Sequence, residues 1–156
     1  MDYIVHILNY LNSMNKNNFE LEKLFRDFYR ALKRESAVLL GENGFTNSDF
    51  LYMRIISKEG NAQASYIAKE MGVRRGYVSA ITARMEKLKL LQRSPLKSDG
   101  RGSILQLTSS GKKTYSSLEK KVSSVFTRKI AKLNSSEIST LMIFLKKMMS
   151  KQDNRK

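Results

Sequence analysis

The sequence of 156 residues predicts a mainly α-helical fold with one small β-hairpin. Apolar residues recur at helical spacing over most of the chain. Two short segments, 91–96 and 103–107, instead have the pattern of strands, and they flank a polar turn that contains glycine. No glycine- or serine-rich linker divides the chain, so nothing marks a boundary between independent domains.

The first half of the chain predicts four helices in succession. From Phe19 the apolar residues follow a 3.6-residue period, and glycines at 41 and 44 end that helix. Thr46 and Asp49 then form a capping box with aspartate in place of glutamate, which begins a second helix. Gly60 breaks this helix, and two shorter helices are expected over about 64–71 and 75–90.

The second half predicts the hairpin and two further helices. Pro95 suits an edge strand, because proline cannot donate a ladder hydrogen bond. Thr108 is the expected N-cap of a long helix, and Ser135 or Ser136 starts the last one. The final residues, 151–156, have nothing to pack against and are expected to fray.

The terminal helices carry more apolar surface than one small core can cover. The apolar residues from 108 to 133 and from 135 to 149 form continuous seams. A second copy of the chain would cover them, so we expect a homodimer through the N- and C-terminal helices. Residues 1–45 and 109–156 would then form the dimerisation helices, with a separate compact domain at 46–108. The alternative is that both seams pack within one chain.

Composition excludes several classes of site. The chain has no cysteine, which excludes disulfides, thiol sensing and cysteine-ligated metals. His6 is the only histidine, so a multi-histidine metal site is excluded too. We find no nucleophile–base pair, phosphate-binding loop or metal-ligand spacing. We therefore expect no enzymatic activity, no metal and no cofactor.

The chain has no features of a membrane or secreted protein. No apolar run approaches the roughly 20 residues that cross a bilayer. The opening segment 3–11 is apolar, but Asp2 stands where a secretory signal would be basic. We expect a cytoplasmic protein that does not contact the membrane.

The net charge of +15 is confined to the second half of the chain. Residues 1–73 contain 9 basic and 9 acidic side chains, whereas residues 74–156 contain 20 basic and 5 acidic ones. A neutral half followed by a strongly basic half indicates a polyanionic partner for the second. A solubilising surface is the alternative interpretation.

The segment 63–81 has the pattern of a helix-turn-helix. Ala68 supplies the small side chain that a close helix crossing needs, and Gly72 supplies the positive φ of the turn. The apolar residues expected to fix the crossing angle are Ile67, Met71, Val73, Val78 and Ile81.

The second helix of this motif is expected to present polar and basic residues outward. They are Arg74, Arg75, Tyr77, Ser79, Ala80 and Arg84. Such a helix can enter the DNA major groove, where arginine bonds guanine O6 and N7 and Ala80 could touch a thymine methyl. A charged helix in solvent is the alternative, and the turn and hairpin on either side favour DNA binding.

Three further segments follow in order: RMEKLKLLQR at 84–93, SDGR at 98–101 and LQLTSSG at 105–111. With them, residues 19–150 resemble the MarR family of winged helix-turn-helix regulators. That family typically shows an RLEKKGLIxR stretch, a D-x-R wing and an L-T-x-x-G opening of the dimerisation helix. The resemblance implies a dimeric transcription regulator that binds a pseudo-palindromic promoter site on double-stranded DNA. Blocking of polymerase is the expected action, with activation as the alternative.

The resemblance also implies roles for individual residues. Arg101 resembles the wing arginine that enters the minor groove, and Asp99 resembles the acid that steadies the wing, with Arg93 as its candidate partner. The expected phosphate contacts come from Gln63, Ser65, Arg84 and Lys97.

The chain departs from the family pattern at several positions. Ala80 and Gly100 stand where the family often has arginine, and Arg74 and Arg75 could replace those contacts. Leu90 is aligned with a position where the family often has glycine. Residues 1–16 are an addition to the usual fold.

Relatives commonly respond to small aromatic or anionic compounds, and a small-molecule effector is possible here. It would bind between the dimerisation helices and the winged domain. The candidate lining residues are Phe28, Tyr29, Tyr52, Met53 and Tyr115, for each of which core packing is the favoured role.

A basic protein that binds RNA, or DNA without sequence preference, is the main alternative function. No GXXG loop or RNP motif is present, which favours duplex DNA. A preference for duplex DNA over RNA would discriminate the two.

Overall fold

A computed structural model describes residues 2–95 and 103–150, with side chains from residue 16 onward. Helices dominate the described part, and three short strands form its antiparallel sheet, which confirms the predicted fold class. The elements are α1 (Asp2–Glu42), α2 (Asn47–Glu59), β1 (Ala62–Gln63), α3 (Ala64–Met71), α4 (Arg75–Lys87), β2 (Leu91–Pro95), β3 (Ser103–Leu107), α5 (Ser109–Ile130) and α6 (Ser135–Met149).

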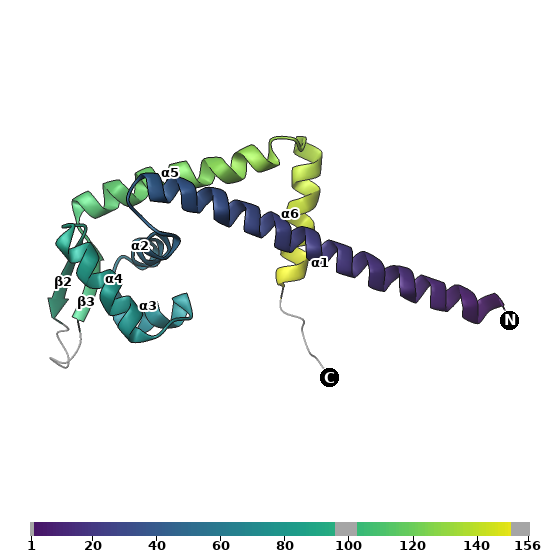
Figure 1. Cartoon of the computed structure of the whole chain (residues 1–156), viewed down its shortest axis with the longest axis horizontal. Helices are drawn as coiled ribbons and strands as arrows, with labels where there is room; N and C mark the ends of the chain where they lie inside the picture. Colours follow the sequence, from purple (N-terminus) through teal and green to yellow (C-terminus); the bar gives the residue numbers. More distant parts are fainter. Residues whose placement is uncertain (1, 96–102, 151–156) are drawn as a thin grey trace.

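The elements form a compact winged domain beneath two long helices (Figure 1). The C-terminal end of α1 lies along α5, and α2 packs beneath both of them. The N-terminal part of α1 extends beyond the rest of the molecule, and α6 turns back from the far end of α5. The core therefore sits where α2, α3, α4 and the sheet meet the α1–α5 pair, and Tyr52, Met53, Ile67 and Leu105 are its centre.

Two of the predicted helix starts are confirmed by their capping hydrogen bonds. The Thr46 hydroxyl accepts from the Asp49 N–H at 3.1 Å, and the Asp49 carboxylate accepts from the Thr46 N–H at 2.7 Å. Thr108 caps α5 by accepting from the Gly111 N–H at 3.0 Å. Asn134, rather than either following serine, caps α6 through a second capping box, with Glu137.

Three helices end in the same way, with one residue in the left-handed region. This residue is Gly44 after α1, Gly72 after α3 and Lys89 after α4, at φ of 79°, 64° and 58°. In each case the N–H of the next residue reaches back to close a Schellman turn; after α4 the Leu90 N–H bonds the Met85 carbonyl at 3.0 Å. The expectation at Leu90 is therefore wrong: Lys89 occupies the glycine-like position, and Leu90 is buried.

The start of α5 is locked against the end of α4. The Thr108 hydroxyl donates to the Lys89 carbonyl at 2.8 Å, and the Thr108 N–H donates to the Leu90 carbonyl at 3.0 Å. Gly111 packs directly on this turn, because a Cβ added there would lie 2.0 Å from the Leu90 carbonyl oxygen. The glycine of the LTSSG segment is thus required by a close backbone approach.

The sheet has a third strand that the sequence pattern missed. Its order is β1-β3-β2, all antiparallel, and β1 pairs Ala62 with Leu105. Two residues are too few to show an alternating pattern, which is why β1 was not predicted. Pro95 lies in β2, an edge strand, as expected.

The N-terminal addition continues α1 as one helix from Asp2 to Glu42, so the helix begins well before the expected Phe19. Within the described residues, no helix combines the length and the apolar character needed to span a membrane. The same residues contain no cluster of three metal-ligating side chains.

Candidate nucleic-acid interface

Helix α4 has one buried and one exposed side. Val78, Ile81, Thr82 and Met85 face the core and are at most 7% exposed. The opposite side presents the residues predicted to face outward: Arg74, Arg75, Tyr77, Ser79 and Ala80 are all exposed. The helix-turn-helix geometry therefore displays the residue set expected for base contacts on a rigid support.

A buried hydrogen bond fixes α4 to α2. The Thr82 hydroxyl donates to the Val78 carbonyl at 2.9 Å, so the Tyr52 hydroxyl, 2.8 Å away, donates to Thr82. Tyr52 is fully buried, and burial raises the pKa of its hydroxyl to about 12. Tyr52 therefore stays neutral at physiological pH and serves as core packing, which was the favoured role.

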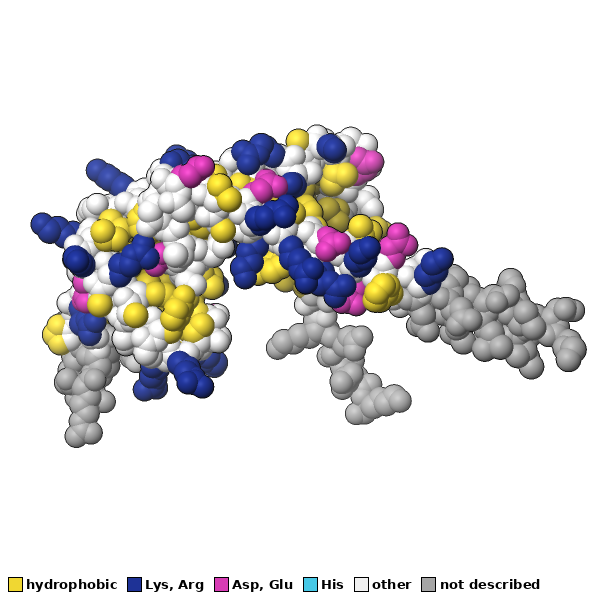
Figure 2. Space-filling model, viewed as in Figure 1, with side chains coloured by type: hydrophobic (Ala, Val, Ile, Leu, Met, Phe, Trp, Pro, Cys, Tyr) yellow, Lys and Arg dark blue, Asp and Glu magenta, His cyan; other side chains and the backbone are white. Residues whose placement is uncertain are grey.

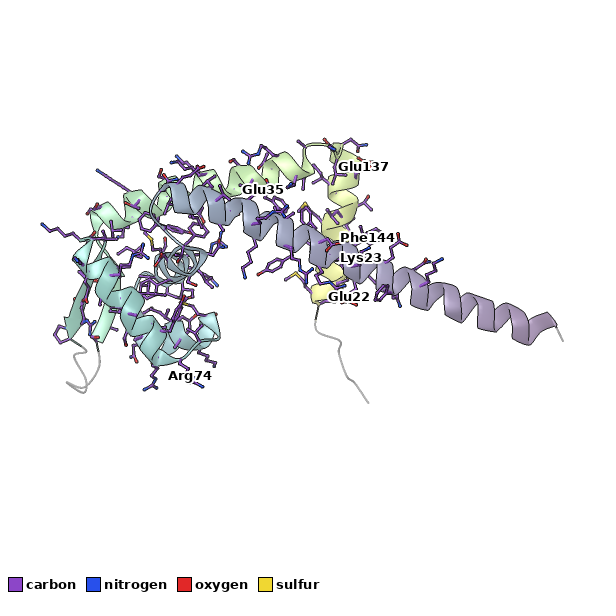
Figure 3. All side chains as sticks on the ribbon, in the orientation of Figure 1. Glu22, Lys23, Glu35, Arg74, Glu137 and Phe144 are labelled. Atoms are coloured by element: carbon purple, nitrogen blue, oxygen red, sulfur yellow. The ribbon has the colours of Figure 1, made fainter. Side chains whose placement is uncertain are left out.

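The N-terminal end of α4 is strongly positive. Neither Arg74 nor Arg75 forms an ion pair within the described part of the chain. In Figure 3, Arg74 lies at the lower tip of the winged domain and points away from it, and Figure 2 shows basic side chains gathered at this tip. The Ser79 hydroxyl already donates a hydrogen bond within α4, to the Arg75 carbonyl at 3.1 Å.

The expected phosphate-contact residues of α3 stand at the start of that helix. Gln63 is the exposed N-cap and forms no side-chain cap hydrogen bond. Ser65, two residues later, is half-buried. The first N–H groups of α3 therefore have no side-chain acceptor from the cap residue. The wing residues Lys97, Asp99 and Arg101 lie outside the described residues.

Two arginines have partners that were not expected. Arg93 pairs with Glu86 of α4, with nitrogen–oxygen distances of 3.2 and 3.3 Å. Asp99, the partner expected for Arg93, lies outside the described residues. Arg84 is partly exposed, but its guanidinium is bonded within the protein, to Asp49 at 2.6 Å and to the Gly44 carbonyl at 2.7 Å. Neither pair follows from a local sequence pattern, and Asp49 also belongs to the capping box of α2.

The candidate effector residues separate into two groups. Tyr52, Met53 and Tyr115 are buried in the core, whereas Phe28 and Tyr29 are exposed. A cavity of about 360 Å³ opens between α2, β3 and α5, and Ser57, Lys112, Tyr115, Ser116 and Glu119 are among its lining residues. The Tyr115 hydroxyl donates to Glu119, and burial together with this bond raises the pKa of Tyr115.

Comparison with known proteins identifies the winged domain. The model of the MarR family matches residues 45–103, the segment that contains α2, the helix-turn-helix and strand β2 of the wing. Residues 45–103 are thus similar to the MarR family. It is also 21% identical over 134 residues to YpoP of Bacillus subtilis, an uncharacterized HTH-type transcriptional regulator, covering 86% of this chain and 94% of the relative. The predicted resemblance is thus confirmed.

Solved MarR structures share the fold over most of this chain. The apo form of wild-type MarR from E. coli has a TM-score of 0.76 at 21% identity, covering 83% of this chain and 96% of that one. A mutant E. coli MarR complexed with operator DNA has a TM-score of 0.69 at 20% identity, covering 86% and 96%. YusO of B. subtilis has a TM-score of 0.68 at 22% identity, covering 89% and 96%.

Proposed function

We propose that this protein is a sequence-specific regulator of the MarR type that binds double-stranded DNA through the N-terminal half of α4. The observation that carries the proposal is the pair of exposed arginines, Arg74 and Arg75, which form no ion pair within the described residues and stand on a helix whose other side is fixed in the core. Arginine at this position can bond guanine bidentately in the major groove. The E. coli MarR mutant with the same fold is complexed with operator DNA.

We propose further that the functional unit is a homodimer held by α1 and α6. Helix α6 has no buried residue, although it is rich in large apolar side chains. Those that are exposed are Met142, Ile143, Phe144, Met148 and Met149, and on α1 they are Phe19, Leu21, Leu24, Phe25, Phe28, Tyr29 and Val38. Apolar patches of this extent on a soluble domain mark an interaction surface. A two-fold dimer would cover both helices at once.

The proposed dimer would act as a repressor by occupying a pseudo-palindromic promoter site. Its two copies of α4 would enter major grooves about one helical turn apart, ~34–36 Å. The cavity beside Tyr115 supports a small-molecule effector, because it lies between the winged domain and α5. A ligand there would change DNA affinity by favouring one position of the winged domain.

The substitution Arg75→Ala should relax sequence preference at one operator position by about 1–3 kcal/mol, because one bidentate base contact is lost. Binding to single-base variants of the selected operator, measured by anisotropy, tests this. Lys58→Ala is the control, since it removes the same charge from an exposed position on α2. An Arg75→Ala protein with the wild-type order of preferences would contradict the assignment.

A further inference from the structure

The guanidinium of Arg84 joins α4 to the corner between α1 and α2. Its Nη1 lies 2.6 Å from Oδ2 of Asp49, and its Nη2 lies 2.7 Å from the Gly44 carbonyl oxygen. Asp49 is 1% exposed, and the same Oδ2 atom accepts from the N–H and the hydroxyl of Thr46, each at 2.7 Å. One arginine therefore completes the capping box of α2 and holds the turn that ends α1.

The other side of this corner is bound to α5. The Lys121 ammonium donates to the side-chain oxygen of Asn43 at 2.6 Å, and the Asn43 side-chain amide donates to the Leu39 carbonyl at 2.7 Å. The corner of residues 43–46 is thus held from α4 by Arg84 and from α5 by Lys121. It is the place where the helices proposed to form the dimer meet the helix proposed to read DNA.

We infer that Arg84 is a positioning residue that sets the angle of the winged domain relative to α1 and α5. This inference rests on the proposed function and assigns Arg84 a role other than phosphate contact. In a two-fold dimer, that angle determines the separation of the two α4 helices. Arg84 thereby fixes which half-site spacing the dimer accepts, without touching DNA itself.

The bonding geometry favours this role over a phosphate contact. Both terminal nitrogens of Arg84 already donate to protein oxygens, and one of these oxygens belongs to a buried carboxylate. Turning the guanidinium toward DNA would leave that carboxylate buried without its counter-charge, which is strongly unfavourable. Lysine cannot replace the contact fully, because its single ammonium lacks the planar fork that reaches both oxygens.

The first test measures half-site spacing. Operators are selected from random duplexes with the wild-type protein, and one base pair is then added to or removed from the centre of the selected site. We expect wild type to lose ~10²-fold in affinity on the altered spacing, and Arg84→Gln to lose only a few-fold. Arg84→Lys should be intermediate. The control is Lys87→Gln, which removes the same charge from an exposed position three residues further along α4. It should behave as wild type.

The salt dependence separates positioning from phosphate contact. A lost phosphate contact lowers the slope of log affinity against log salt by about 1. We expect an unchanged slope for Arg84→Gln. A reduced slope with unchanged spacing discrimination would overturn the inference and restore the phosphate role.

A second test uses no DNA, so its result remains informative about Arg84 even if the proposed function is wrong. The chain has no cysteine, so spin labels can be placed at Glu70→Cys on α3 and Ser123→Cys on α5, both exposed positions. Doubly labelled chain is mixed with an excess of unlabelled chain, and the distance distribution between the labels is measured. We expect a broader or shifted distribution in Arg84→Gln and a wild-type distribution in Lys87→Gln. A wild-type distribution in Arg84→Gln would overturn the positioning role, even if the protein selects no operator.

Discussion

The double substitution Ile143→Glu/Phe144→Glu should convert the protein into a monomer and lower its operator affinity by ~10²–10⁴-fold, because the second half-site is no longer bound intramolecularly. Ile143 is 63% exposed and Phe144 57% exposed in the single chain, so the change removes little intrachain packing. In the proposed dimer both side chains are buried, and each contributes about 1.5–3 kcal/mol on burial. Two charges placed in that interface would have no partner.

Sedimentation equilibrium measures the oligomeric state, and unfolding of the winged domain in urea shows whether it remains folded. The control is Ser135→Glu, which places a negative charge on an exposed, polar position at the start of α6, more than one helical turn from Ile143 and Phe144. We expect Ser135→Glu to remain dimeric. A double variant that is still dimeric, with wild-type affinity, would show that the exposed side of α6 is not the dimer interface.

The substitution Gly111→Val should destabilise the protein by about 3 kcal/mol or more, since overpacking here displaces backbone. A Cβ at this position would lie 2.0 Å from the Leu90 carbonyl oxygen and 3.0 Å from its carbonyl carbon. Neither atom can move freely, because the Leu90 oxygen accepts the Thr108 N–H and the turn at Lys89 is tied to the Thr108 hydroxyl. The substitution must therefore separate α5 from the end of α4.

Urea unfolding of the purified variant gives the change in free energy of unfolding. Gly41→Ala is the control: no atom lies within 4 Å of the added Cβ, and Gly41 is in α1. Since alanine favours a helix over glycine, this control should gain about 0.5–1 kcal/mol. Equal stabilities for Gly111→Val and wild type would contradict the close approach.

Local rules explain what the sequence predicted. The Thr46 and Thr108 caps and the Gly72 turn each depend on residues within a few positions of one another, and the hairpin strands follow each other directly along the chain. The positions of α4 that are exposed follow from helical spacing once its buried residues are known. These features place the candidate interface before any tertiary contact is considered.

Long-range pairing explains what the sequence did not predict. Arg84 pairs with Asp49, 35 positions earlier, and Arg93 pairs with Glu86. Neither partner follows from local spacing. Lys89 occupies a left-handed turn that glycine usually fills, so the residue type gave no signal there. The strand β1 forms only because β3 offers it a free edge.

The central claim is that this basic protein reads DNA sequence as a dimer, and a titration tests it most directly. The protein is titrated onto its selected duplex, a scrambled duplex and an RNA duplex of equal length, at several salt concentrations. We predict affinity at least ~10³-fold higher for the selected duplex at physiological salt, with two chains per site. Equal affinities with the same steep salt dependence would contradict the claim, because the net charge of +15 would then act as a polycation without sequence preference.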